Sequence, residues 1–202
     1  MRRGFPQRVE LHNMVASNMS TTAGIEPGQK APFFQLPNAN NSIGNEILSL
    51  SDIIAANGAV ITFTCNHCPY VVGSESRIEE MAKKATKNNI GFVGINSNDP
   101  IKYESDSWAN MVKRASKGMS YAYLHDEDQS VATIYGAERT PEFYLLDSTG
   151  IVVYRGRLDD SPRDPAHATT SELSDAIDSM LSGKEIIENR TESIGCSVKW
   201  KV

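Results

Sequence analysis

The amino-acid sequence predicts a single α/β domain built around a mixed β-sheet. Two apolar, β-branched runs, 59–63 (AVITF) and 90–96 (IGFVGIN), are typical of strands covered on both faces. The segment between them, 69–89, places apolar residues on one helical face, so the three pieces form a βαβ unit. A later segment, 142–156, has two β-rich runs around the turn 147–150 and predicts an antiparallel hairpin.

The other elements flank this core in chain order. The expected strands are 33–36, 47–50 and 120–124, and the expected helices lie within 51–55, 99–119, 128–136 and 170–184. Ser51 is the expected N-cap of the first helix, and a capping-box pattern of Thr169 with Glu172 opens the last one. The fold class is therefore α/β, a central mixed sheet flanked by helices, with an N-terminal β extension and an extra C-terminal segment.

Length and charge limit the possible functions. The chain has 202 residues and a net charge of −5, which predicts one domain, 27–202, preceded by a flexible tail, 1–26. We expect no binding to nucleic acid, because no basic face is available to displace counterions from phosphates. No apolar run approaches the roughly 18 residues of a membrane span. The expected location is cytoplasmic, although Arg2, Arg3 and Arg8 leave a weak organellar transit peptide open.

The segment VITFTCNHCPYV places Cys65 and Cys68 where the first buried strand leads into a helix. A Cys-x-x-Cys beside a βαβ pattern is the signature of a thioredoxin-like redox site. The helix N-terminus stabilises a thiolate and could lower the pKa of Cys65 from roughly 8.5 to about 6.5. We therefore expect Cys65 to be the nucleophile, Cys68 a less exposed resolving thiol, and His67 a catalytic residue that favours the thiolate.

Two other interpretations of the pair remain open. Structural zinc sites usually need four ligands in two paired motifs. Beyond this one pair, the chain offers as further ligands only Cys196 and the scattered His12, His125 and His167. The pair could also be two ordinary core cysteines, although a helix start followed by proline is a partly exposed place. We expect no metal and no cofactor apart from a redox-active disulfide.

The motifs resemble those of a known family. The motifs are KAPFFQLPN, LSLSDI, VITFTCNHCPYV, IGFVGIN and YLHDEDQSVATIYGAERTPEFYLLDSTGIVVYRGRLDD. Taken together, they resemble the thioredoxin-fold alkyl hydroperoxide reductase and thiol-specific antioxidant superfamily. Within it, they are most similar to peroxiredoxin-like proteins with a Cys-Asn-His-Cys-Pro-Tyr site. The resemblance covers residues 27–161. It implies that Thr140–Pro141 is a cis-proline step beside the cysteines, where Thr140 offers backbone groups to an extended substrate. Asn66, Thr140 and Pro141 are the expected substrate-binding residues.

The chain departs from the peroxiredoxin pattern at two places. Peroxiredoxins resemble one another through the motif Pro-x-x-x-Thr-x-x-Cys. In this chain Thr62 fits the motif, but Gly58 stands at the position of the proline. The arginine that polarises peroxide would align close to Pro141, with Arg139 and Arg155 as nearby candidates. Peroxidase chemistry is therefore the alternative rather than the first hypothesis.

The chain also departs from thioredoxins. Their buried acid, about six residues before the first cysteine, is replaced by Ala59, so proton transfer from Cys68 would use water or another acid such as Glu142. Cys196 has two interpretations: a small buried residue of the C-terminal segment, or a third thiol that forms a mixed disulfide with Cys65 or receives its oxidising equivalents.

Three functions are thus predicted in order of preference. The first is a thiol-disulfide oxidoreductase that acts on a protein or small-molecule disulfide or dithiol, together with a thiol reductant. The second is a thiol peroxidase with Cys65 as the attacked thiolate. The third is a non-enzymatic redox or metal-binding module. The sequence does not predict an oligomeric state.

Overall fold

The computed structural model describes residues 24–202, so the predicted tail, 1–26, lies almost entirely outside the described residues. The last residues of this segment contact the folded chain. The N–H of Ile25 donates to the carbonyl oxygen of Tyr135 at 3.2 Å, and Glu26 forms ion pairs with Arg155 and Arg190. None of the described helices is both long and apolar enough to cross a membrane.

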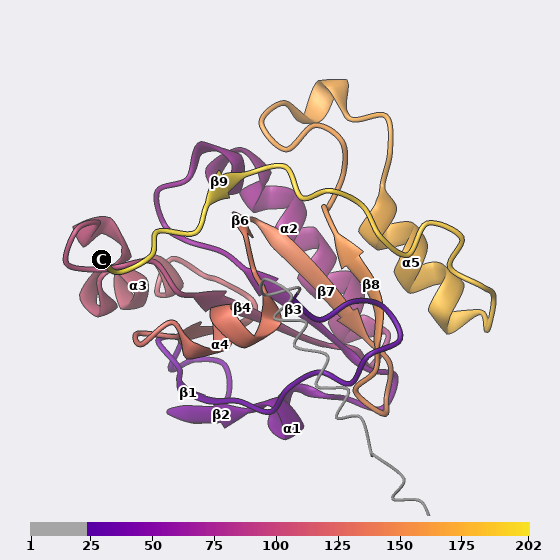
Figure 1. The fold of residues 1–202 in the computed structure, drawn as a ribbon, viewed down its shortest axis with the longest axis horizontal. Helices are drawn as coiled ribbons and strands as arrows, with labels where there is room; N and C mark the ends of the chain where they lie inside the picture. The colour runs from indigo at the N-terminus through magenta and orange to yellow at the C-terminus, as the bar shows by residue number, and fades with distance from the viewer. Residues whose placement is uncertain (1–23) are drawn as a thin grey trace, which may run out of the picture.

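The predicted mixed sheet is confirmed (Figure 1). Five strands lie in the order β5-β4-β3-β7-β8. They are β3 (Ala59–Phe63), β4 (Gly91–Asn96), β5 (Ala122–His125), β7 (Glu142–Leu146) and β8 (Val152–Gly156). β4 is parallel to β3 and β5, whereas β7 is antiparallel to β3 and β8. The parallel strands end at one edge of the sheet, where β3 leads into the cysteine pair.

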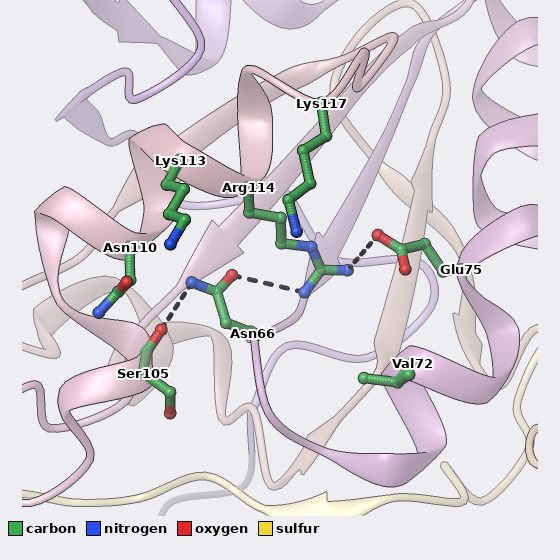
Figure 2. A pocket seen from close by; sticks show the side chains of 8 residues that line it. All are labelled: Asn66, Val72, Glu75, Ser105, Asn110, Lys113, Arg114 and Lys117. Carbon is green, nitrogen blue, oxygen red and sulfur yellow. Dashed lines mark hydrogen bonds and ion pairs between the residues drawn. The ribbon is translucent and has the colours of Figure 1, made fainter.

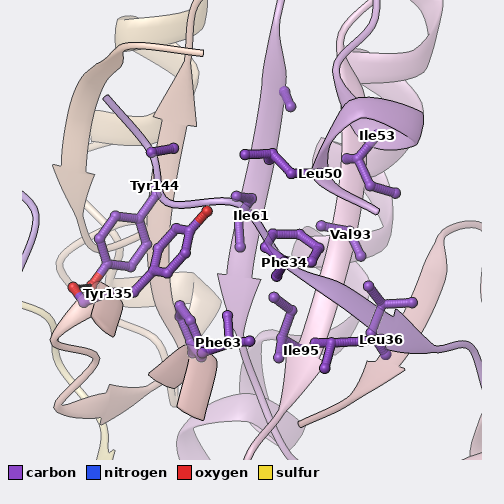
Figure 3. Close-up of a cluster of buried hydrophobic side chains, with 14 of the residues drawn as sticks. Phe34, Leu36, Leu50, Ile53, Ile61, Phe63, Val93, Ile95, Tyr135 and Tyr144 are labelled. Carbon is purple, nitrogen blue, oxygen red and sulfur yellow. Dashed lines mark hydrogen bonds between the residues drawn. The ribbon is translucent and has the colours of Figure 1, made fainter. Parts of the chain in front are cut away.

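Helices cover both faces of the sheet, because successive side chains of a strand point to opposite sides. The helices are α1 (Leu50–Ile53), α2 (Pro69–Lys87), α3 (Trp108–Ala115), α4 (Ser130–Tyr135) and α5 (Glu172–Leu181). Val60 packs with residues of α2, α3 and α5 on one face. Ile61 and Phe63 pack on the other face with α1, α4 and the N-terminal strands (Figure 3). Both faces of β3 are therefore buried, as its continuous apolar sequence predicted.

The N-terminal β extension is a hairpin of β1 (Gln35–Pro37) and β2 (Ile47–Ser49). The N-cap of the helix that follows is Ser49, not the expected Ser51. The Ser49 hydroxyl accepts from the N–H of Asp52, and the Asp52 carboxylate accepts from the N–H of Ser49 at 2.8 Å. This reciprocal capping box fixes the helix start two residues earlier than predicted.

The C-terminal segment crosses the molecule from α5, passes β6 at β9, and ends near α3 (Figure 1). Its strand β9 (Cys196–Ser197) pairs antiparallel with the short strand β6 (Arg139–Thr140) just before β7. The N–H of Val198 extends the pairing by donating to the carbonyl oxygen of Glu138 at 3.0 Å. The sequence showed no period in this segment, because two residues of strand are too short to carry one.

A buried ion pair holds the chain around Pro141. Glu142, at the start of β7, accepts from Arg155 of β8 at 2.8 Å, and both side chains are almost fully buried. The same carboxylate accepts from the backbone N–H groups of Glu138 and Arg139. Arg155 in turn donates to the carbonyl oxygen of Gly136 at 2.6 Å. The pair therefore ties residues 136–142 to the sheet.

Replacing Arg155 with Met should lower the free energy of unfolding by about 3–5 kcal/mol, because Glu142 would be left buried without its cation. Urea titration followed by circular dichroism measures the loss. Arg190→Met is the matched control: Arg190 pairs with Glu26 at a site where its side chain is 40% exposed, and such pairs contribute less than about 1 kcal/mol. Equal effects of the two substitutions would contradict the role given to the buried pair.

Candidate active site

The cysteine pair lies where β3 ends and α2 begins. β3 ends at Phe63, two residues before Cys65, and Cys68 is the N-cap of α2 with Pro69 in the first turn. The N–H groups of Val71 and Val72 donate to the carbonyl oxygen of Cys68 at 3.0 and 2.9 Å and begin the helix. The backbone N–H of Cys68 lowers the pKa of Cys65, and that of Val71 lowers the pKa of Cys68. The two thiols lie close enough for each to shift the pKa of the other.

Both cysteines are completely buried, with a relative exposure of 0% each. This differs from the expectation of an accessible Cys65 and a more protected Cys68. Tyr70 from the first turn of α2 and Cys196 from β9 pack against the pair. The expectation failed because a segment distant in sequence covers the helix start. A substrate larger than a few atoms can reach the sulfurs only when this cover moves.

The two thiols have very different pKa values. The hydrogen bond with Cys65 lowers the pKa of Cys68 to about 4 against the opposing effect of burial, with support from hydrogen bonds of Cys196 and Val71. The same bond between the sulfurs raises the pKa of Cys65, as do burial and the carboxylate of Asp106. These directions differ from the expected lowering of the pKa at Cys65, because the two thiols shift each other's pKa in opposite directions.

Thr140 contacts both sulfurs, and its contacts favour a thiol proton on Cys68. The sulfur of Cys68 lies 3.1 Å from the carbonyl oxygen of Thr140, to which only a protonated thiol donates. The sulfur of Cys65 lies 3.5 Å from the Thr140 hydroxyl. When the proton sits on Cys68, the Cys65 thiolate accepts from that hydroxyl and from the N–H of Cys68. The contacts with Thr140 therefore suit a protonated Cys68 and an accepting Cys65.

Asp106 is a buried acid beside the pair that the sequence analysis missed. It ends the short helix η1 (Glu104–Asp106) and is 0% exposed. Its carboxylate lies 2.6 Å from Nδ1 of His67 and accepts from the backbone N–H of Asn66 at 2.6 Å. The His67 ring also stacks on Tyr103, with centroids 5.3 Å apart. His67 is therefore held beside Cys65 by an acid that lies 39 residues away in the sequence and belongs to no recognisable motif.

The same group could be considered as a metal site. Cys65, His67 and Asp106 offer one ligand atom each within 4.8 Å of one another. Both carboxylate oxygens of Asp106, however, already accept from N–H donors, including the side-chain amides of Asn96 and Asn98 at 3.1 and 2.9 Å. A cation at this position would face those donors, and a structural zinc would need a fourth ligand. The donor set favours hydrogen bonding over metal coordination.

Asn66, an expected substrate-binding residue, is engaged within the protein (Figure 2). Its side-chain N–H donates to the carbonyl oxygen of Ser105 at 2.7 Å. Its side-chain oxygen accepts from the hydroxyl of Tyr123 at 2.8 Å and from Arg114 at 3.4 Å. These bonds fix the loop between the cysteines instead of leaving the amide free for a substrate.

Arg114 is a second residue near the pair that the sequence analysis missed. Its guanidinium donates to the carbonyl oxygen of Cys65 and forms an ion pair with Glu75 at 3.3 Å. It borders an open pocket of about 320 Å³, where Lys113 and Lys117 also lie (Figure 2). Arg114 thus approaches the backbone of Cys65 rather than its sulfur. The helical spacing of this segment gave no sign that one arginine would reach the cysteines.

The peptide bond between Thr140 and Pro141 is cis, and the step lies beside both cysteines as the resemblance implied. The backbone of Thr140 is already paired in this structure. β9 of the same chain already pairs with it, in a register that sets Cys196 opposite Thr140. The expectation of a free edge at Thr140 is therefore corrected: the chain supplies its own strand.

The two other accessory residues have different positions. Glu142 is engaged by Arg155 and by two backbone N–H groups, so it is not a free acid for Cys68. Arg139 is exposed and pairs through its backbone with Ser197. Neither side chain is among the groups that hydrogen-bond the sulfurs of the pair. Asp106, which binds His67 beside Cys65, is instead a buried acid that lies near the pair.

A mixed sheet flanked by helices, with a Cys-x-x-Cys at a helix start facing a cis-proline, defines the class of thioredoxin-like redox proteins. The chain belongs to the AhpC/TSA family, whose model matches residues 27–155. A relative from Mycobacterium tuberculosis, named "Putative peroxiredoxin Rv2521", is 26% identical over 134 residues, which are 66% of this chain and 78% of the relative.

Solved structures share the fold. An uncharacterised conserved protein from Geobacillus kaustophilus is 38% identical with a TM-score of 0.79, over 87% of this chain and 92% of that one. The "C-terminal domain of putative thiol-disulfide oxidoreductase from Bacteroides thetaiotaomicron" is 26% identical with a TM-score of 0.56, over 78% and 97% of the two chains. The chain is therefore similar both to proteins named for disulfide exchange and to proteins named for peroxide reduction.

The low pKa of Cys68 predicts an unusual pH dependence of the redox equilibrium. Between the pKa of about 4 at Cys68 and roughly 8.5, where glutathione ionises, reducing the pair takes up one proton, whereas reducing oxidised glutathione takes up two. The equilibrium constant with glutathione should therefore shift about tenfold per pH unit, or about 30 mV, towards the reduced protein as the pH rises from 5 to 8.

This constant can be measured in the Cys196→Ser variant, in which only one disulfide can form within the chain. Quenching with acid and separating the thiol and disulfide forms by mass gives the ratio at each pH. Two thiols with ordinary pKa values would give a constant that does not change with pH. Such a flat profile would contradict the lowered pKa of Cys68.

Proposed function

We propose that this protein is a thiol-disulfide oxidoreductase that works through Cys65 and Cys68. The observation that supports this most strongly is the contact of both sulfurs with Thr140, at the start of α2 and beside the cis Thr140–Pro141 step. A thiol pair that is half ionised near neutral pH has a nucleophile ready, and its second sulfur is placed to break a mixed disulfide.

The reaction begins when the proton moves to Cys68, leaving Cys65 as the thiolate. Cys65 attacks one sulfur of a substrate disulfide, and the other substrate sulfur leaves with the electron pair and takes a proton. Cys68 then loses its proton and attacks the sulfur of Cys65, which releases the second substrate thiol. The Cys65–Cys68 disulfide forms as the substrate is reduced, and an external dithiol or two monothiols reverse the oxidation.

His67 and Asp106 support the proton movements in this scheme. Asp106 fixes the imidazole through Nδ1, so the other ring nitrogen is available to a proton near Cys65. The side chain of His67 is 29% exposed, whereas that of Asp106 is fully buried. His67 therefore connects the buried pair with solvent, which is the task that a buried acid before the cysteines performs in thioredoxins.

Thiol peroxidase activity is the second candidate. Membership of the AhpC/TSA family favours it, and so does the closed site, because hydrogen peroxide is smaller than any disulfide. In that reaction the Cys65 thiolate would take one oxygen, forming a sulfenic acid and hydroxide, and Cys68 would then form the disulfide and release water. Arg114 contacts the Cys65 carbonyl instead of the sulfur, and this weakens the case for peroxide activation.

Replacing the cysteines separates the steps of the exchange. Cys65→Ser should abolish the reduction of insulin disulfides by dithiothreitol, because the attacking sulfur is lost. Cys68→Ser should instead accumulate a mixed disulfide between Cys65 and the substrate, seen by mass spectrometry without reductant. Ser182→Ala, at the exposed end of α5, is the control and should retain full activity. Undiminished exchange in Cys65→Ser would overturn the mechanism.

Stopped-flow mixing with hydrogen peroxide distinguishes the two candidates. The reduced protein should lose thiols no faster than free cysteine at the same thiolate concentration, because no cationic side chain contacts the Cys65 sulfur among the described residues. Cys65→Ser provides the background rate. A rate several orders of magnitude above free cysteine, abolished by that substitution, would establish the peroxidase instead.

A further inference from the structure

The strand β9 occupies the position at which a substrate chain would pair with the active site. It lies antiparallel to β6, with Cys196 opposite Thr140 and Ser197 opposite Arg139. A partner strand at this edge is how extended peptides add to an exposed sheet edge. The chain's own C-terminus therefore binds as a substrate would, and it brings a cysteine to the same place.

Gly195 lets β9 approach this closely. A Cβ atom at Gly195 would lie 2.2 Å from the carbonyl oxygen of Thr140 and 3.2 Å from the nitrogen of Pro141. These are backbone atoms, held in place by the Glu142–Arg155 pair, and they cannot rotate away as a side chain would. Any other residue at position 195 would therefore push β9 off the Thr140–Pro141 step.

Cys196 meets the pair at Cys68. Its side chain packs on the cluster of Cys65, Cys68 and Val71, and its thiol and backbone N–H both lower the pKa of Cys68. Burial and the neighbouring charge on Cys68 raise the pKa of Cys196 to about 11, as expected for a thiol that donates to a thiolate. Three sulfurs thus form one continuous group.

We propose that β9 is an internal substrate strand and that Cys196 is a third redox thiol, which exchanges disulfides with Cys68. The inference rests on the proposed function only for the origin of the Cys65–Cys68 disulfide. The sulfur of Cys196 loses its proton and attacks the sulfur of Cys68, and the Cys65–Cys68 bond breaks. Cys65 leaves with the electron pair and takes the proton, so one disulfide replaces another without an external oxidant.

The exchange gives the oxidised protein two forms. In the first, the Cys65–Cys68 disulfide leaves β9 held only by hydrogen bonds and packing, so it can be displaced by a substrate chain. In the second, the Cys68–Cys196 disulfide ties β9 to α2 and keeps Thr140 covered, while Cys65 is a free thiol. An external chain can pair with Thr140 only in the first form, so the internal disulfide closes the site to large substrates.

The Cys65→Ser variant of the full chain tests the inference without any turnover. It is treated with oxidised glutathione, its free thiols are blocked, and the digest is mapped by mass spectrometry. A Cys68–Cys196 disulfide should be the main product, because the two thiols already touch. In Cys65→Ser with Cys196→Ser, Cys68 should instead end as a glutathione adduct or a blocked thiol.

A second pair of variants tests the strand itself. Adding Gly195→Ala to Cys65→Ser should lower the yield of the Cys68–Cys196 disulfide at least tenfold, because β9 no longer seats. Adding Ser197→Ala, which changes an exposed side chain of the same strand, should leave the yield unchanged. Circular dichroism checks that each variant is folded, and the cysteine variants alone decide the outcome if Gly195→Ala does not fold.

The results separate this inference from the proposed function. Cys196 recovered as a free, blocked thiol in oxidised Cys65→Ser, with glutathione on Cys68, would overturn the inference whatever the exchange activity of the wild-type chain. A Cys68–Cys196 disulfide in a protein that fails to reduce insulin would retain the inference and remove the proposed function. Equal yields with Gly195 and with Ala at that position would contradict the role of the seated strand.

Discussion

The proposed chemistry depends on the close approach of the Cys65 and Cys68 thiols at the start of α2, where each shifts the pKa of the other and both contact Thr140. Burial alone would keep both thiols neutral, because it disfavours the charged form. The start of α2 offsets that cost by aiming backbone N–H groups at the sulfurs, and Thr140 adds a hydroxyl and a carbonyl oxygen. These groups therefore favour a thiolate at the pair against the cost of its burial.

The surroundings of the pair combine rigid support with a removable cover. On one side, Asp106 fixes His67 and the N–H of Asn66, so the loop between the cysteines is held by buried hydrogen bonds. On the other side, the contact is made by a strand of two residues at the end of the chain. Such a short strand contributes few bonds and can separate locally without unfolding the sheet. The inferred control of access to the site therefore lies on the C-terminal side.

Family membership and site geometry point in somewhat different directions. The chain belongs to the AhpC/TSA family and is similar to a relative named as a putative peroxiredoxin. The guanidinium of Arg114, however, donates to the backbone carbonyl oxygen of Cys65 and not to its sulfur. Thr62, which fits the peroxiredoxin spacing, has a buried hydroxyl without a hydrogen-bond partner among the described residues. The groups around the sulfurs, namely a helix N-cap, a neighbouring thiol and the residue before a cis-proline, favour the proposed disulfide exchange.

The sequence by itself determined the βαβ unit, the mixed sheet and the position of the cysteine pair, because periodicity, turn residues and the Cys-x-x-Cys spacing act over short distances. The cover by Cys196, the acid at Asp106 and the reach of Arg114 were decided only by the tertiary structure. These residues lie far from the pair in sequence, and no local pattern records which distant side chains a folded backbone brings together. The same reason explains why the lower pKa was expected at Cys65: the helix start is visible in the sequence, whereas the partners of each sulfur are not.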